Sequence, residues 1–325
     1  MPTLTRYLSA KAGSWSYGFV RHVLSLALLL AITALLAGQA AAQTTKTFPA
    51  GEGPSGLAFD GANIWVADLF GASVTKLRAS DGMLLGTFAA GSAPLAVVFD
   101  GENIWVANQA DNTVTKLRSS DGAPLGVFPA GDTPSALAFD GASIWVANFL
   151  SAGTVTKLRA SDGALEATIP VGNSPSGLAF DGANIWVTNQ GSGTVTKLRA
   201  SDGVSLGVFN VGANPYPVVT DGTYVWVGNY VGKSVSKLLV SDGSLVGGFP
   251  IQVSSFGMAY DGKSIWVGDF NRHYAGRFGA GEGVPHKRYP VGAAPAALLF
   301  DGTAIWVANR AGNTVTKIGD AHPAR

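Results

Sequence analysis

The sequence contains no cysteine, which excludes disulfide bonds, thiolate catalysis and any metal site that depends on cysteine ligands. Charged residues make up only 13% of the chain, about half the usual share, and the net charge is +1 with no basic block or stripe. A nucleic-acid-binding function therefore lacks the positive surface that phosphate contacts need. The sequence also holds no nucleophile elbow, no His-Glu-x-x-His zinc motif and no phosphate-binding glycine loop.

A nine-residue stretch recurs along the chain, and its clearest copy is residues 100–108, Asp-Gly-Glu-Asn-Ile-Trp-Val-Ala-Asn. Its tryptophans follow one another at spacings of 40, 40, 41, 40, 40 and 40 residues. A fixed period of about 20–50 residues is typical of repeat architectures, whose units bury their apolar faces against one another. The seven copies therefore predict one folded body, although a length of 325 residues alone would suggest about two domains.

The second copy shows what one repeat contains. Residues 94–99 form a short apolar run, an Asp-Gly turn follows, and residues 104–107 form a second apolar run. After a loop of turn-forming residues, residues 113–118 alternate and are β-branched, and residues 124–128 form a fourth run. Short strands separated by turns predict a four-stranded antiparallel blade, and seven blades lie within the range for a β-propeller. We expect an all-β, seven-bladed propeller.

The two ends of the repeat region are complementary. The last copy stops after its third strand, residues 313–318, while residues 44–49 before the first copy resemble a fourth strand. We expect residues 44–49 to complete the seventh blade and close the ring, which removes the exposed edge that an open array would leave.

Residues present in every copy are expected to belong to the scaffold. We expect the tryptophans to pack between neighbouring blades: Trp65, Trp105, Trp145, Trp186, Trp226, Trp266 and Trp306. We interpret the aspartates of the Asp-Gly turns as hairpin residues rather than metal ligands: Asp60, Asp100, Asp140, Asp181, Asp221, Asp261 and Asp301. A matching set of cations is expected to pair with turn aspartates or to extend along apolar surface: Lys76, Lys116, Lys157, Lys197, Lys237, Arg277 and Lys317.

The first 42 residues resemble a secretory signal peptide. Arg6, Lys11 and Arg21 precede an apolar run over residues 23–37, and residues 40–42 offer an Ala-x-Ala cleavage site. The alternative is an uncleaved membrane anchor. We expect residues 1–42 to be the signal peptide, residues 43–319 the propeller and residues 320–325 a C-terminal tail, in a secreted or periplasmic protein.

The repeat resembles the roughly 40-residue YVTN-type propeller repeat and the repeat of the virginiamycin B lyase family, over residues 44–319. Its consensus runs Pro-Ser-Gly-Leu-Ala-Phe-Asp-Gly-x-x-Ile-Trp-Val-Ala-Asn, followed by Thr-Val-Thr-Lys-Leu. The resemblance implies a seven-bladed propeller and, for the lyases, a magnesium-assisted elimination that uses a histidine and a glutamate. The expected histidine positions hold Ser55, Leu95, Ser135, Ser176, Tyr216, Phe256 and Ala296. The expected glutamate positions hold Asp68, Asn108, Asn148, Asn189, Asn229, Asp269 and Asn309.

Departures from the repeat mark where a site could have been built. The topology places the crossovers between copies and the loops after the tryptophan strands on one face, beside the central channel, and the fifth and sixth copies depart most there. The candidate ligand-binding residues are Tyr216, Tyr230, Phe256, Asp269, Phe270, Arg272 and His273. Phe70, Phe149 and Arg310 lie on the same predicted face. The alternative is sequence drift, because the sixth copy also loses its Ser-Asp-Gly turn.

The sequence favours a non-catalytic, monomeric binding module, with a protein, peptide or glycan ligand on the crossover face. We expect no nucleic-acid partner, membrane contact only through an uncleaved signal segment, and no catalytic residue, cofactor or metal. Two enzyme hypotheses stay open: a lyase of the virginiamycin B type and a cofactor- or calcium-dependent propeller enzyme. Magnesium or calcium would be required only under these hypotheses.

Overall fold

The computed structural model of the protein describes residues 45–150, 152–279 and 287–319. The predicted signal segment 1–42 and tail 320–325 lie outside these residues, as do His286 and His322. Within the described ranges, no helix has the length and apolar character needed to cross a membrane.

Each repeat forms four strands that pair in sequence order into one antiparallel sheet. The first strands are β2 (Pro54–Phe59), β6 (Pro94–Phe99), β10 (Pro134–Phe139), β14 (Pro175–Phe180), β18 (Pro215–Thr220), β22 (Ser255–Tyr260) and β26 (Pro295–Phe300). The second strands are β3 (Asn63–Asp68), β7 (Asn103–Asn108), β11 (Ser143–Asn148), β15 (Asn184–Asn189), β19 (Tyr224–Asn229), β23 (Ser264–Asp269) and β27 (Ile305–Asn309). The third strands are β4 (Ser73–Arg78), β8 (Thr113–Arg118), β12 (Thr154–Arg159), β16 (Thr194–Arg199), β20 (Ser234–Leu239), β24 (Tyr274–Gly279) and β28 (Thr314–Ile318). The fourth strands are β5 (Leu84–Ala89), β9 (Pro124–Pro129), β13 (Leu165–Pro170), β17 (Ser205–Asn210), β21 (Leu245–Pro250), β25 (Lys287–Pro290) and β1 (Thr45–Pro49).

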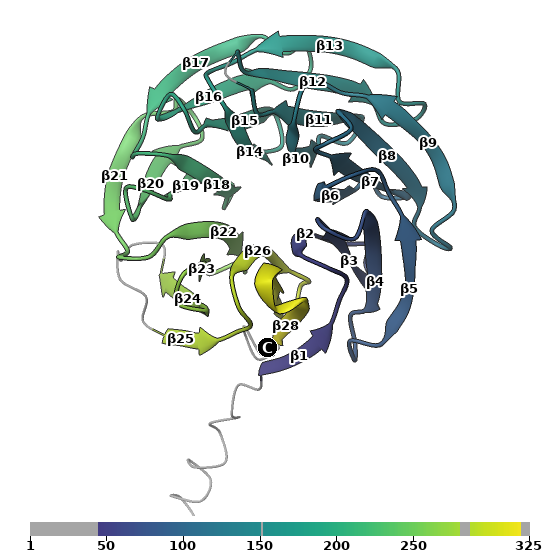
Figure 1. The fold of residues 1–325 in the computed structure, drawn as a ribbon. Helices are drawn as coiled ribbons and strands as arrows, with labels where there is room; N and C mark the ends of the chain where they lie inside the picture. The colour runs from purple at the N-terminus through teal and green to yellow at the C-terminus, as the bar shows by residue number, and fades with distance from the viewer. Residues whose placement is uncertain (1–44, 151, 280–286, 320–325) are drawn as a thin grey trace, which may run out of the picture. The chain divides into compact units, whose positions relative to one another are not determined.

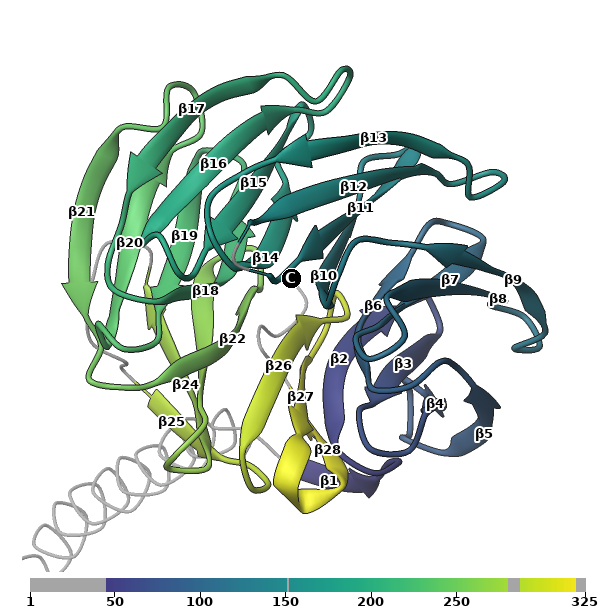
Figure 2. The same ribbon diagram turned by 45° about the horizontal axis from the view of Figure 1, so that its top comes forward.

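The seven sheets stand around a central axis as the blades of a propeller (Figure 1). The first strand of each blade lies nearest the axis and the fourth lies at the rim, as the oblique view also shows (Figure 2). We number the blades from one to seven in the order of their first strands. This architecture confirms the expected all-β, seven-bladed fold.

The chain closes the ring as expected. Strand β1 pairs antiparallel with β28, with Thr45 opposite Ile318 and Pro49 opposite Thr314, so the seventh sheet has the order β1-β28-β27-β26. The purple β1 and the yellow β28 lie side by side in Figures 1 and 2. The third strand of the last blade is therefore covered, and its main-chain groups are paired.

The tryptophans form the core between blades, as predicted. Trp65 packs with Ile104, Val106 and Leu117 of the next blade, and the same arrangement recurs around the ring to Trp306, which packs on the first blade. All seven indoles are at most 1% exposed. A ring of this kind has no single centre of apolar packing, because each interface between blades has its own cluster.

The aspartate of each Asp-Gly turn holds the tryptophan of its own blade. In all seven blades the indole Nε1 donates to Oδ2 of this aspartate at 2.7–2.8 Å. Its Oδ1 accepts two main-chain N–H groups of the turn, at 2.9 and 2.6 Å for Asp100. Burial opposes ionisation of Asp60, Asp181 and Asp301, but hydrogen bonds from side chains and the main chain outweigh it and lower their pKa values. The scaffold interpretation of these aspartates is confirmed.

The repeated cations were expected to pair with turn aspartates or to extend along apolar surface, and their contacts show the second of these two modes. Five of them donate from Nζ to a main-chain carbonyl of the next blade, at 2.7–3.0 Å; these are Lys76, Lys116, Lys157, Lys197 and Lys317. Each repeated cation also lies over the tryptophan of its own blade, 4.6–5.8 Å from the ring centroid. The ammonium groups therefore tie neighbouring blades together through carbonyls and ring faces.

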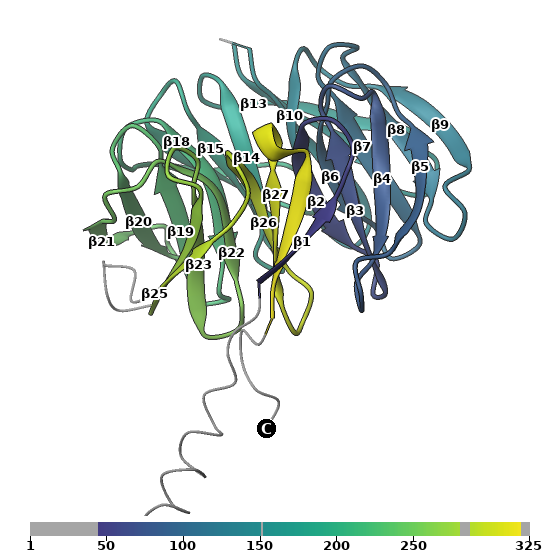
Figure 3. The ribbon, with the colours of Figure 1, turned by 60° about the horizontal axis from the view of Figure 1, so that its bottom comes forward.

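The loops divide between two faces. The crossovers between blades and the loops between second and third strands meet on one face, where main-chain bonds such as Leu69 N to Gly53 O and Ala90 N to Ala72 O join them. We call this the crossover face, and the opposite one, with the Asp-Gly and Ser-Asp-Gly turns, the turn face. The single 3-10 turn of the described residues, η1 (Arg310–Gly312), stands on the crossover face and is drawn in yellow at the upper end of the strands in Figure 3.

Candidate functional site: the mouth of the central channel

The first strands line a central channel of about 230 Å³. Each strand contributes three consecutive residues, such as Ser55, Gly56 and Leu57 in the first blade, and none of the lining residues is charged. The serine hydroxyls in this lining already donate to the main chain; Ser55, for example, donates to the carbonyls of Ala67 and Pro94 at 3.0 Å. The channel wall therefore carries no charged side chain, and its serine hydroxyls already bond within the fold.

The first strands of the fifth and sixth blades depart from the others at the channel mouth. In five blades pairing with the second strand resumes at the third residue of the first strand, as at Gly56, but in β18 and β22 it resumes only at the fourth. Pro217 explains the gap in β18, because proline has no N–H to donate. A methyl group at Gly228, opposite, would lie 2.7 Å from Pro217 Cγ. Irregular strand pairing of this kind changes the direction of nearby side chains, and the side chains at these positions are Tyr216 and Phe256.

Four of the predicted site residues form one aromatic cluster, which we call the mouth cluster: Tyr216, Tyr230, Phe256 and Phe270. The ring centroid of Phe256 lies 4.4 Å from that of Tyr216, 4.9 Å from Phe270 and 5.7 Å from Tyr230. Phe256 and Tyr216 also line the channel. All four side chains are half-buried, so ring surface stays accessible to a ligand.

Arg310 of the seventh blade covers the mouth cluster. Its guanidinium carbon lies 5.0 Å from the ring centroid of Phe256 and 6.0 Å from that of Phe270. Its Nε is buried without a hydrogen-bond partner, and none of the ion pairs between described residues includes it. Burial lowers the pKa of Arg310, and burial also raises the pKa of Tyr216, an effect that the nearby guanidinium partly offsets. The channel mouth therefore presents a cation that lies over aromatic rings.

Asp269 does not join the mouth cluster. It is the last residue of β23 and is only 2% exposed. Its Oδ1 accepts the main-chain N–H groups of Asn271 and Arg272 at 3.1 and 3.3 Å, so the carboxylate organises its own loop. In five other blades the same position holds a buried asparagine, such as Asn108.

Arg272 and His273 also contact the main chain rather than the aromatic rings. Arg272 donates to the carbonyl of Gln252 at 3.2 Å. His273 has a left-handed backbone with φ of 57°, and its Nδ1 accepts the N–H of Ala294 at 3.1 Å. Asn313 fills the equivalent place in the seventh blade and accepts the N–H of Gly53 at 2.9 Å. The predicted residues thus separate into four that meet at the mouth and three that hold loops.

The other exposed aromatics of the crossover face stand apart. Phe70 is 68% exposed, and between described residues neither it nor Phe149 makes a ring contact with the mouth cluster. The residue missing from the predicted set is Arg310. Its signal was available in the sequence, because the equivalent residues of the other blades are uncharged: Leu69, Gln109, Phe149, Gln190, Tyr230 and Phe270.

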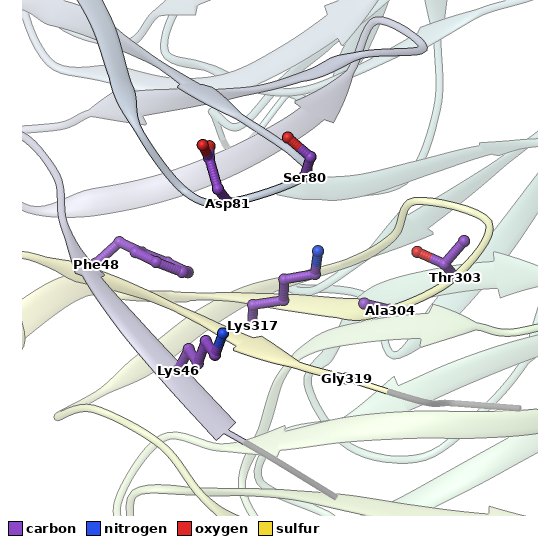
Figure 4. A pocket seen from close by; sticks show the side chains of 8 residues that line it. All are labelled: Lys46, Phe48, Ser80, Asp81, Thr303, Ala304, Lys317 and Gly319. Carbon is purple, nitrogen blue, oxygen red and sulfur yellow. The ribbon is translucent and has the colours of Figure 1, made fainter. Parts of the chain in front are cut away.

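A second cavity, of about 240 Å³, lies on the turn face where the seventh blade meets the first (Figure 4). Two of its charged groups already have partners within the fold. Lys317 Nζ donates to the carbonyl of Ala79 at 2.7 Å, and Asp81 pairs with Arg78 at 3.2 Å. The closure of the ring accounts for these side chains, so this cavity is a weaker candidate than the channel mouth.

Metal ligation has no visible basis in the part of the chain that the structure describes. No group of three or more histidine, aspartate or glutamate side chains is placed to hold an ion there. Asp269 and His273 flank one loop, and each side chain accepts main-chain N–H groups: Asp269 those of Asn271 and Arg272, His273 that of Ala294. The chemistry of the mouth is that of an aromatic surface with one guanidinium.

Fold and site together define a seven-bladed β-propeller with one irregular sector, over blades five to seven. No family model matches the sequence, and neither does any curated protein. The solved structures that are similar include the following two. A chain of hydrazine synthase from Kuenenia stuttgartiensis aligns with a TM-score of 0.74 and 20% identity, over 83% of this chain and 96% of that one. A streptogramin B lyase aligns with a TM-score of 0.73 and 16% identity, over 84% and 96%. At these identities the likeness establishes the propeller fold, which confirms the fold that the family resemblance implied.

Proposed function

We propose that this protein is an exported, non-catalytic binding module that takes its ligand on the crossover face, at the channel mouth. The observation that carries the proposal is the convergence of four half-buried aromatic rings under a guanidinium that has no anionic partner among the described residues. Apolar pockets with a few polar groups are the usual form of a ligand site. A protein, peptide or glycan segment would fit such a surface.

The rest of the ring supports a scaffold role. Tryptophan, turn aspartate and lysine recur with the same contacts from blade to blade, whereas blades five to seven replace small or uncharged residues by Tyr216, Phe256 and Arg310. Aromatic residues and arginine are also the side chains enriched at binding hot spots. Export is supported by the N-terminal signal pattern.

The proposal is tested by peptide and glycan arrays probed with the wild-type protein and two matched variants. Phe256→Ser puts into the sixth blade the serine that three other blades carry, as at Ser55. Leu95→Ser makes the same change at the equivalent position of the second blade, across the channel. We expect Phe256→Ser to lose array binding and Leu95→Ser to retain it, with both variants melting near the wild-type temperature. Equal binding by all three proteins would contradict the proposal.

A metal titration separates this function from the two enzyme hypotheses. A propeller enzyme that holds magnesium or calcium in its folded state should melt at a higher temperature when the ion is added. We expect no change in melting temperature with either ion. An increase that disappears in an Asp269→Asn variant would favour an enzyme instead.

A further inference from the structure

The irregular sector is built from two positions of the repeat that meet at the channel mouth. One position follows the first residue of the inner strand and holds Tyr216, Phe256 and then Ala296 in blades five to seven. The other follows the second strand and holds Tyr230, Phe270 and then Arg310. Blades five and six carry an aromatic residue at both. In blade seven the first position holds the small Ala296 in place of an aromatic residue, and the guanidinium of Arg310 lies over the ring of Phe256.

The guanidinium of Arg310 is poised for an anion. The Nε–H is buried, and the two terminal nitrogens are not, so these can present N–H groups that match the two oxygens of a carboxylate. Across the described residues no carboxylate reaches this group, although four other arginines, Arg78, Arg118, Arg159 and Arg199, pair with aspartates on the turn face. A half-buried cation without a counter-ion has lost part of its hydration, so an incoming anion is favoured.

A second donor stands beside it. The hydroxyl of Tyr216 makes no hydrogen bond with any residue in the described ranges, and its raised pKa keeps it protonated as a donor. Phe256 and Phe270 supply ring faces beside these donors, and the neighbouring channel wall contains no charged side chain. The site therefore offers two donors for an anionic head and ring faces for a flat apolar body.

From this arrangement, and resting on the function proposed above, we infer that the site binds a carboxylate joined to an aromatic ring, with the carboxylate on Arg310 and the ring against Phe256 and Phe270. Tyr216 and Phe256 also line the central channel, of about 230 Å³, whereas Phe270 and Arg310 stand outside its lining. The ligand group therefore needs to span only these four side chains. A small aromatic acid and the C-terminal aromatic residue of a peptide present the same chemistry.

The test uses calorimetric titration with two pairs of probes. N-acetylphenylalanine is compared with N-acetylphenylalanine amide, and a short peptide ending in phenylalanine is compared with its amidated form. We expect each acid to bind wild type at least tenfold more tightly than its amide, a difference of about 1.4 kcal/mol. If the two acids bind with equal affinity, a free aromatic acid is a sufficient ligand. If the peptide acid binds more tightly, the ligand is the C-terminus of a peptide.

Matched variants locate the carboxylate. Arg310→Gln introduces the residue that two other blades carry there, Gln109 and Gln190, and should abolish the preference for acid over amide. Arg310→Lys, which keeps the charge without the planar fork, should retain part of it. Arg78→Gln, on the turn face, should bind as wild type does. Melting curves verify that each variant is folded.

Two results would contradict the inference, and only the second of them would also contradict the proposed function. If acid and amide bind equally, or Arg310→Gln keeps the preference, while Phe256→Ser weakens both, the carboxylate subsite is wrong and the binding face stands. If wild type binds neither the probes nor any member of the arrays, the proposed function fails together with the inference.

Discussion

Replacing Asp68 by asparagine should stabilise the protein at neutral pH. Asp68 ends β3, is 0% exposed, and stands where five other blades carry asparagine. The hydroxyls of Ser73 and Thr75 donate to its Oδ2 at 3.0 and 2.8 Å. Burial nevertheless dominates over these hydrogen bonds and raises the pKa of Asp68 from 3.8 to about 6. At neutral pH the first blade therefore holds a buried carboxylate in a site that the other blades fill with an amide.

The direction and size of this stability change follow from the linkage between proton binding and folding. Because the folded-state pKa is raised, the folded protein prefers the protonated acid, and the contribution of Asp68 to stability is complete below pH 3.8. It is lost as the pH rises through about 6. A difference of this size corresponds to about 3 kcal/mol in the free energy of unfolding above that pH. Asp68→Asn should therefore gain up to about 3 kcal/mol at neutral pH and almost nothing near pH 4.

Denaturant unfolding at a series of pH values measures this difference directly. The converse variant, Asn108→Asp, places a carboxylate in the equivalent site of the second blade, where the amide now donates to Thr113 and Thr115 at 3.0 and 2.8 Å. It should lose stability at neutral pH and recover on acidification. A stability difference between wild type and Asp68→Asn that is the same at every pH, or a loss at neutral pH, would refute the reasoning.

Three further predictions concern the scaffold. Deletion of residues 45–49 uncovers the edge of β28, so we expect a lower melting temperature and aggregation by light scattering; unchanged behaviour would contradict closure by β1. Asp100→Ala removes the acceptor for the Trp105 indole and for two turn amides and should cost about 2–4 kcal/mol in denaturant unfolding. Lys116→Met keeps the apolar stem but deprives the Ala160 carbonyl of its donor, which should cost about 1–3 kcal/mol; a loss below about 0.5 kcal/mol would count against the tie between blades.

Much of the fold could be predicted because each repeat contains the contacts that hold its own turn and tryptophan. The turn aspartate and the indole that it holds are five residues apart, so every copy of the repeat contains both partners, as Asp100 and Trp105 illustrate. The lysine contacts could not be found in the same way. Lys76 donates to a carbonyl 43 residues further on, and that partner depends on how one blade packs on the next. Of the two expected modes, extension along apolar surface is confirmed, and the bond to the carbonyl of the next blade was not predicted.

Site residues could be predicted where they differ from the residues at the equivalent positions of the other repeats. Tyr216 and Phe256 replace small residues at one position and do meet. Asp269 and His273 also looked unusual, yet they occupy scaffold positions: the buried residue that ends each second strand and a left-handed loop residue. Comparing them with the other copies one position at a time would have separated them from the cluster. The stacking of Arg310 on Phe256 joins two blades, so no local pattern contains it.

Hydrogen–deuterium exchange with and without N-acetylphenylalanine tests most directly whether the channel mouth of blades five to seven is the functional surface. Slower exchange is expected in the crossovers 211–214 and 251–254 and in the loop 310–313, with no change in the turns at residues 80–82 and 120–122. Protection confined to the turn face, or spread evenly around the ring, would contradict the account.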